Sequence, residues 1–278
     1  MNPLARLPQA LLRLSVLCAA LGAAYSASAE VLPPFTLNPA GSAPPLAGAQ
    51  VRADNIIISD FSTVRLTGAT FSDSGFLSVQ SFQLGGTTVV AGGLNSTYGL
   101  FFEFSGTGSV TSANPATTPT FGQFSSLNYT LYGYNGPAAT FGFDGSDNPT
   151  TSVAAGSRVA LATGSLLPGA GQSSVGTTPQ TPSFNAFASA NLSFVPTATA
   201  GTFFLSPNPF YNVAVSSFIN SPSQVSPLTG GFAGGFSITN GGGSVNFTSP
   251  VPEPETYALF LAGIAAVGWT ARRRRSLT

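Results

Sequence analysis

Glycine and proline recur so often in this chain that they restrict which secondary structure it can form. Over the segment 30–250, one or the other interrupts nearly every window of ten residues, and Ser, Thr and Asn fill the intervals. Glycine and proline weaken helix interiors, and the whole set of residues is typical of turns. No stretch has a convincing amphipathic helical pattern. The segment is therefore predicted to form short β-strands.

Alternating apolar residues mark the strands. Tyr98–Phe104 places its even-numbered apolar residues on one face and Glu103 on the other, and Leu127–Tyr134 alternates as well. Ten more segments have strand composition: Asn55–Ser59, Val64–Phe71, Phe76–Leu84, Thr140–Phe143, Arg158–Thr163, Asn191–Val195, Thr202–Leu205, Tyr211–Phe218, Phe232–Ile238 and Ser244–Thr248. Short strands separated by frequent turns indicate an antiparallel sandwich or barrel.

We predict the all-β class and a single antiparallel β-sandwich or jelly-roll-like domain over residues 30–250. Two stretches rich in Pro, Gly, Ser and Thr, Ala113–Thr120 and Leu167–Ser183, are expected to be loops. Of the 23 phenylalanines, 22 lie in this domain. At alternate positions of strands they are expected to fill the core.

The reactive side chains are largely missing from the domain. The segment 30–250 contains no His, Lys, Cys, Met or Trp, and it has three Arg and seven acidic residues. A Ser-His-Asp triad, a Cys nucleophile and a His- or Cys-ligated metal are therefore excluded there. Three cations are too few for a nucleic-acid surface. We expect a protein that is not an enzyme, uses no cofactor and binds no nucleic acid.

The N-terminus has the features of a secretory signal peptide over residues 1–29. Arg6 and Arg13 provide the positive charge, and Leu14–Ala24 is an apolar stretch too short to span a bilayer. Ala27 and Ala29 fit the small-residue cleavage pattern. The chain is expected to pass the Sec translocon and lose this segment.

The C-terminal segment 251–278 combines three signals. Pro252, Glu253 and Pro254 precede an uncharged stretch, Tyr257–Ala271, which is followed by four arginines: Arg272, Arg273, Arg274 and Arg275. A helix over the uncharged stretch is about 22 Å long at 1.5 Å per residue, short of the ~30 Å hydrocarbon core. The arginines are expected to hold the C-terminus in the cytoplasm.

This tail resembles the PEP-CTERM sorting signal of exopolysaccharide-producing Gram-negative bacteria. All three parts are present in the order that the signal requires. The resemblance implies transient insertion in the inner membrane and removal of the helix by an exosortase-type protease that recognises the Pro-Glu-Pro motif. A permanent single-span anchor is the alternative.

Within PEP-CTERM proteins, the domain looks like the flocculation-associated family. Four short motifs carry this similarity: Leu37-Asn38-Pro39, Ala53-Asp54-Asn55-Ile56, Ser206-Pro207-Asn208-Pro209-Phe210-Tyr211 and Val245-Asn246-Phe247. The resemblance implies a role in the aggregation of cells with extracellular polysaccharide, at the cell surface or in the matrix. It assigns no functional residue in the domain.

Three local patterns are candidate sites. Asp144 and Asp147 lie in a Gly-bearing loop whose oxygens could bind Ca²⁺, although the same residues form ordinary turns. Tyr132 and Tyr134 share a strand face with Asn128 and Thr130 and could contact a sugar, or they could be partly buried rim residues. A pair of acids could serve a glycosidase, but no spacing identifies a pair.

The sequence thus predicts a secreted structural protein whose neutral Ser, Thr, Asn and Gly surface binds polysaccharide or other copies of itself. A carbohydrate-binding module is the second hypothesis, and a polysaccharide-active enzyme is the third.

Overall fold

The structure is a computed structural model that describes residues 32–112, 114–169, 171–180 and 183–248. It is built from strands β1 (Phe35–Leu37), β2 (Val51–Ala53), β3 (Asn55–Thr67), β4 (Thr70–Leu84), β5 (Thr87–Val89), β6 (Tyr98–Val110), β7 (Thr120–Asn135), β8 (Phe141–Phe143), β9 (Pro149–Thr151), β10 (Val159–Ser165), β11 (Ser173–Pro179), β12 (Phe184–Ser193), β13 (Val195–Pro196), β14 (Phe204–Ser206), β15 (Val213–Asn220), β16 (Val225–Pro227) and β17 (Gly235–Thr248). Short 3-10 turns are η3 (Pro39–Gly41), η4 (Ala155–Ser157), η5 (Ala198–Ala200) and η6 (Pro222–Gln224).

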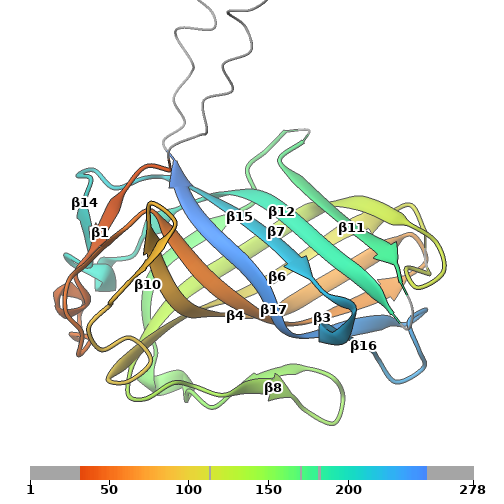
Figure 1. Cartoon of the computed structure of the whole chain (residues 1–278), viewed down its shortest axis with the longest axis horizontal. Helices are drawn as coiled ribbons and strands as arrows, with labels where there is room; N and C mark the ends of the chain where they lie inside the picture. The colour runs from red at the N-terminus through yellow and green to blue at the C-terminus, as the bar shows by residue number, and fades with distance from the viewer. Residues whose placement is uncertain (1–31, 113, 170, 181–182, 249–278) are drawn as a thin grey trace, which may run out of the picture. The chain divides into compact units, whose positions relative to one another are not determined.

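The longest strands form one sheet that closes on itself (Figure 1). Its order is β3-β4-β6-β7-β11-β12-β15-β17, and β17 pairs again with β3. Every pairing around this circuit is antiparallel. Closure rests on three residue pairs between β11 and β7, at Val175, Gly176 and Thr177.

The prediction of an all-β, antiparallel domain is confirmed. The sheet also closes on itself, and one connection in it is long: residues 136–172, between β7 and β11, contain hairpin β8–β9 and strand β10. The circuit closes through β11, whose Gly176 pairs with Phe121 of β7 on one side and with Phe187 of β12 on the other.

Strand β11 corrects the expectation of a loop over Leu167–Ser183. Its sequence, Ser-Ser-Val-Gly-Thr-Thr-Pro, contains one large apolar residue, so it shows no alternating pattern. Its pairing on both sides supplies the backbone hydrogen bonds that make it a strand. Tertiary pairing thus overrides the weak local preference.

Strands β3 and β4 differ from the predicted segments for a related reason. The structure joins Asn55–Ser59 and the start of Val64–Phe71 into the single strand β3 and places a two-residue turn at Gly68 and Ala69. Gly68 has φ of 60°, which a glycine adopts without a steric penalty. Polar inward positions in the middle of β3 hid its continuity from the alternation pattern.

A small second sheet, β14-β1-β2, lies at the end of the circuit where β17 finishes. The Phe247 ring packs edge-on against Phe35 of β1, with centroids 5.0 Å apart, and against Phe194, at 4.8 Å. Phe247 is only 1% exposed. Some of the phenylalanines expected in the core therefore pack together at this end of the closed sheet and fill it; we call them the plug.

Strand β10 also belongs to the main sheet, where it pairs with residues 128–133 of β7 and buries Leu161 and Ala162. Hairpin β8–β9 forms its own two-stranded sheet, and Figure 1 shows it beside the closed circuit. Its Phe141 packs over Phe76 of β4 and Phe101 of β6, with centroid distances of 5.7 Å in both cases. In the described part of the chain, no helix is long and apolar enough to cross a membrane.

Replacing Phe247 tests the importance of the plug. Phe247→Ala is expected to lower the free energy of unfolding by about 3–5 kcal/mol, because it leaves a cavity among packed rings. Phe121→Ala, at a ring that is 53% exposed, should change it by less than about 0.5 kcal/mol. Urea unfolding of both variants measures the difference, and equal effects would contradict the assignment.

Candidate functional site

The interior of the closed sheet contains a cavity of about 110 Å³. Most of its walls are apolar, with large side chains such as Phe102, Phe124 and Phe236. Strand β12 contributes small ones, Ala186, Ala188 and Ala190, which leave the space open. A cavity of ~150 Å³ with apolar walls holds a benzene molecule, so this one has the volume for a compact ligand.

Among the polar residues that line the cavity, Asp60 of β3, Asp73 of β4 and Asn220 of β15 each carry a buried oxygen without a partner. Together with the buried Ser62, two residues from Asp60 in β3, we call them the polar cluster. Asp60 is 5% exposed, and Ser62 and Asn220 are more deeply buried still. Residues 60 and 62 are two apart in one strand, so their side chains point to the same face.

Two glycines make room for the polar cluster. Gly241 of β17 pairs with Asp60, and a Cβ atom at position 241 would lie 2.1 Å from Asn220 Oδ1. Gly75 of β4 pairs with Ser62, and a Cβ atom there would lie 2.6 Å from the Ser62 Cβ atom. Side chains at either glycine would therefore collide with members of the cluster.

The polar cluster is electrostatically unbalanced. Burial raises the pKa of Asp60 from 3.8 to about 7, and the nearby Ser62 hydroxyl opposes the shift only in part. Burial, together with the charge of Asp60, raises the pKa of Asp73 well above its ordinary value, whereas the Ser74 backbone N–H opposes this shift. Both shifts follow from moving a carboxylate out of water with no cation beside it.

One polar atom of each member lacks a hydrogen-bond partner among the described residues: Asp60 Oδ1, Ser62 Oγ, Asp73 Oδ1 and Asn220 Oδ1. An unsatisfied buried polar group costs roughly 1–3 kcal/mol. Asp60, Asp73 and Asn220 line the cavity, and unpartnered polar groups that face an apolar cavity are typical of a binding site.

Sequence reasoning did not identify the polar cluster, although a signal was present. Even-numbered positions of β3 run Ile56, Ile58, Asp60, Ser62, Val64, so two polar residues interrupt an otherwise apolar face. Proximity to Asp73 follows only from the register of β3 with β4, and proximity to Asn220 only from the pairing of β15, β17 and β3.

A second hollow lies on the outer face of the sheet, and we call it the outer groove. Its volume is about 460 Å³, and its walls are Ser74, Gly75, Phe76, Glu103, Phe104, Ser105, Asn128, Tyr129, Thr130, Asn148 and Pro149. These residues come from β4, β6 and β7 and from hairpin β8–β9. Hydroxyl and amide groups thus make up much of its exposed lining, and such groups can hydrogen-bond to a sugar.

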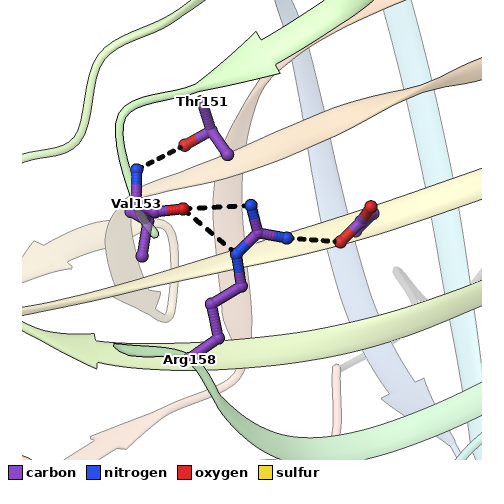
Figure 2. Close-up of polar contacts among 4 residues, drawn as sticks. Thr151, Val153 and Arg158 are labelled. Atoms are coloured by element: carbon purple, nitrogen blue, oxygen red, sulfur yellow. Dashed lines mark hydrogen bonds and ion pairs between the residues drawn. The ribbon is translucent and has the colours of Figure 1, made fainter. Parts of the chain in front are cut away.

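Arg158 fixes the segment that borders the outer groove. Figure 2 shows its guanidinium donating from Nε and Nη2 to the Val153 carbonyl oxygen, at 3.2 and 3.0 Å. Its Nη1 pairs with Glu103 at 2.8 Å. The guanidinium carbon also lies 5.4 Å from the Phe101 ring centroid and 5.8 Å from that of Tyr132. Arg158 therefore links the segment that follows hairpin β8–β9 to β6 and β7.

The two tyrosines predicted as sugar contacts have different surroundings. Tyr134 is 5% exposed, and its hydroxyl accepts a hydrogen bond from the Ala139 backbone N–H. Tyr132 is half-buried and packs against Phe101, with ring centroids 5.5 Å apart. Their neighbour Asn128 is exposed and lines the outer groove, as does Thr130. The amide of Asn128 and the hydroxyl of Thr130 are therefore accessible from the groove, whereas Tyr134 is buried.

The predicted calcium loop forms a turn at the tip of hairpin β8–β9. Asp144 Oδ1 accepts hydrogen bonds from the backbone N–H groups of Ser146 and Asn148, which lower its pKa together with the Asn148 side chain. Asp147 Oδ2 accepts from the Thr229 N–H at 3.3 Å. Over the described ranges, no group of three or more His, Cys, Asp or Glu residues is placed to hold a metal ion.

The terminal signals lie outside the described residues. These are the predicted cleavage residues Ala27 and Ala29, the motif Pro252, Glu253 and Pro254, the helix Tyr257–Ala271, and the cluster Arg272, Arg273, Arg274 and Arg275. The structure therefore tests none of these predictions.

Comparison with known proteins bears on the C-terminal segment. Residues 250–275 match the model of the PEP-CTERM protein-sorting motif, PEP_exosort_dom. The chain therefore carries a PEP-CTERM sorting signal, and this signal implies a secreted protein that passes the membrane and is targeted to exosortase, a membrane protein. No curated protein and no solved structure matches the chain.

The polar cluster predicts how stability depends on pH. Folded Asp60 keeps its proton until about pH 7, whereas the unfolded residue loses it near its ordinary pKa of about 3.9. Between these values the folded state binds more protons, so the free energy of unfolding should fall as pH rises from 4 to 7.

Asp60→Asn should flatten this fall and raise stability at pH 7, because it removes the ionising group from the cavity. Asp54→Asn is the matched control, since Asp54 lies outside the cavity and accepts a hydrogen bond from the Gly85 N–H. Thermal unfolding at four or more pH values tests the expectation. An Asp60→Asn profile parallel to that of the parent would refute it.

Proposed function

We propose that the exported domain promotes aggregation of cells by contacting extracellular polysaccharide, or further copies of itself, at the surface of a Gram-negative bacterium. The sorting signal accounts for delivery. The contact itself would use the neutral outer face of the closed sheet, and the outer groove is its best-formed part.

The observation that carries this proposal is the scarcity of free charge on the outside. Asp60 and Asp73 face the cavity and Asp54 is buried. Arg158 pairs with Glu103, and Arg65 donates to Ser146 O and Asn148 Oδ1 in the hairpin. Arg52 and Asp144 are the other charged side chains exposed in the described chain. Polar contact with this surface therefore depends mainly on hydroxyl and amide groups, and such contact is little affected by salt.

The outer groove supports polysaccharide as the partner. Asn128 and Ser105 are exposed there, and Thr130 is half-exposed. Phe76 also lines the groove and is 7% exposed. A groove of this volume falls in the range of small-molecule sites, about 300–1,000 Å³. A carbohydrate-binding module with one defined subsite is the second candidate, and the same groove would be that subsite.

We further propose that the domain has no catalytic role. Asp60 and Asp73 form the one carboxyl pair whose charges are coupled within the described residues. They share an apolar cavity of about 110 Å³, whereas a glycosidase must hold a sugar on each side of the scissile bond. The pair is thus poorly suited to glycoside hydrolysis.

Processing at the C-terminus is tested by changing the Pro-Glu-Pro motif. Replacing Pro252, Glu253 and Pro254 by alanine should leave the uncleaved chain in the membrane fraction, because the protease loses its recognition segment. Mass spectrometry of the exported protein shows both chain ends. The matched control replaces Ser276, Leu277 and Thr278, and export that is unaffected by the motif change would contradict processing there.

Contact with polysaccharide is tested in the outer groove. The double variant Asn128→Ala/Thr130→Ala should lower co-sedimentation with the producing strain's polysaccharide at least about fivefold, since it removes two groups worth about 0.5–1.5 kcal/mol each. Ser217→Ala, exposed on β15, is the control.

Flocculation of a deletion strain complemented with each variant gives the cellular readout. Loss of flocculation with the double variant, and recovery with Ser217→Ala, supports the proposal. Unchanged flocculation in the deletion strain itself removes the aggregation role. Binding to an isolated glycan without any effect on flocculation would favour the carbohydrate-binding module.

A further inference from the structure

We propose that the interior cavity binds a small apolar amine, whose ammonium group is held by Asp60 and Asp73 and whose apolar body fills the space beside them. This site is separate from the outer groove, and it does not depend on the role in aggregation.

The hydrogen-bonding needs of the polar cluster select a donor. Asp60 Oδ1, Asp73 Oδ1 and Asn220 Oδ1 are acceptors without a partner within the described residues. The fourth atom, Ser62 Oγ, can accept as well as donate. A primary ammonium carries three N–H donors, so one such group can serve several of these oxygens at once.

Charge selects a cation. None of the arginines of the described chain lines the cavity. Arg65 and Arg158 are held by the outer hairpin segment, and Arg52 is exposed on β2. Two carboxyl groups without a counter-ion are costly to ionise in an apolar site. A monocation beside them converts this penalty into a charge-assisted hydrogen bond.

The walls select an apolar body of limited size. Leu77, Leu127 and Ile238 face the cavity together with the alanines of β12. A hydrated metal ion would leave this apolar surface uncovered. A cavity near 110 Å³ suits a single ring or a short branched alkyl chain, by comparison with the ~150 Å³ that holds benzene.

Binding of a cation should be coupled to proton release. The titratable groups that line the cavity are Asp60 from β3, Asp73 from β4 and Tyr129 from β7. The Tyr129 hydroxyl already donates to the Ser193 carbonyl oxygen, at 2.8 Å, and burial raises its pKa. An ammonium ion favours ionised carboxyls, so amine affinity should rise between pH 5 and pH 8, over which Asp60 loses its proton.

Three ligands of similar shape test the proposal: benzylamine, benzyl alcohol and benzoate. Isothermal titration calorimetry of the exported protein, purified without detergent, should show benzylamine binding at least about tenfold tighter than benzyl alcohol, since tenfold corresponds to 1.4 kcal/mol. Benzoate should not bind. Repeating the titration in buffers of different ionisation enthalpy measures the protons released.

Two variants and one control locate the site. Asp60→Asn keeps the shape of the side chain and should weaken benzylamine at least about tenfold, as loss of one partner of a buried charge pair does. Ala188→Leu fills the cavity and should abolish binding of benzylamine and benzyl alcohol alike. Asp54→Asn, a buried acid outside the cavity, should bind benzylamine as the parent does.

Several outcomes overturn the proposal. They are no binding of benzylamine, equal affinity for benzylamine and benzyl alcohol, affinity that does not change between pH 5 and pH 8, and binding that survives Ala188→Leu. If Asp60→Asn fails to fold, as judged by circular dichroism, the pH dependence of the parent and the Ala188→Leu result decide. A Ca²⁺ titration that displaces no amine and binds nothing supports the amine, whereas tight Ca²⁺ binding at the polar cluster refutes it.

Discussion

Closure of the sheet by β11 is the interaction on which the rest of the structure depends. A sheet edge exposes a row of unpaired N–H and C=O groups. Here β11 pairs with β12 along its whole length and with β7 at Val175, Gly176 and Thr177. The closed ladder satisfies the backbone without help from large side chains. The chain can therefore use Ala, Ser and Gly at many inward positions, and the interior keeps a cavity that a stacked pair of sheets would have filled.

The tightest aromatic packing of the domain and its unsatisfied buried polar groups lie in different places. The rings of Phe35, Phe194 and Phe247 meet at one end of the circuit, with edge-to-face contacts that stabilise it. Asp60 and Asp73 lie along the wall with unsatisfied oxygens. Natural sequences break the rules of core packing chiefly where function requires it. The polar cluster is such a break, since alanine or leucine at those positions would give a more stable domain.

The sequence predicted the fold class correctly but gave no indication that the sheet closes on itself. Alternation in β6 and β7 and the frequent turns identified an all-β domain, because both are local properties. Strand β11 was missed because its residues are small and its stability comes from two partners distant in sequence. The glycines of β17 likewise concealed a continuous strand over Gly235–Thr248.

Asp60 and Asp73 are 13 positions apart in the chain, and only the register of β3 with β4 makes them lining residues of one cavity. Tyr134 was predicted to be a sugar contact or a partly buried rim residue, and the segment that follows β7 buries it, with the Ala139 N–H bonded to its hydroxyl.

The contact between Phe35 and Phe247 also determines how the domain is presented during export. It brings the first and last described strands, β1 and β17, to the same end of the circuit. Thr248 ends β17, and Pro252 is four residues further on, so the chain between them spans at most about 14 Å. A protease that recognises this motif would therefore act within a short distance of the folded domain.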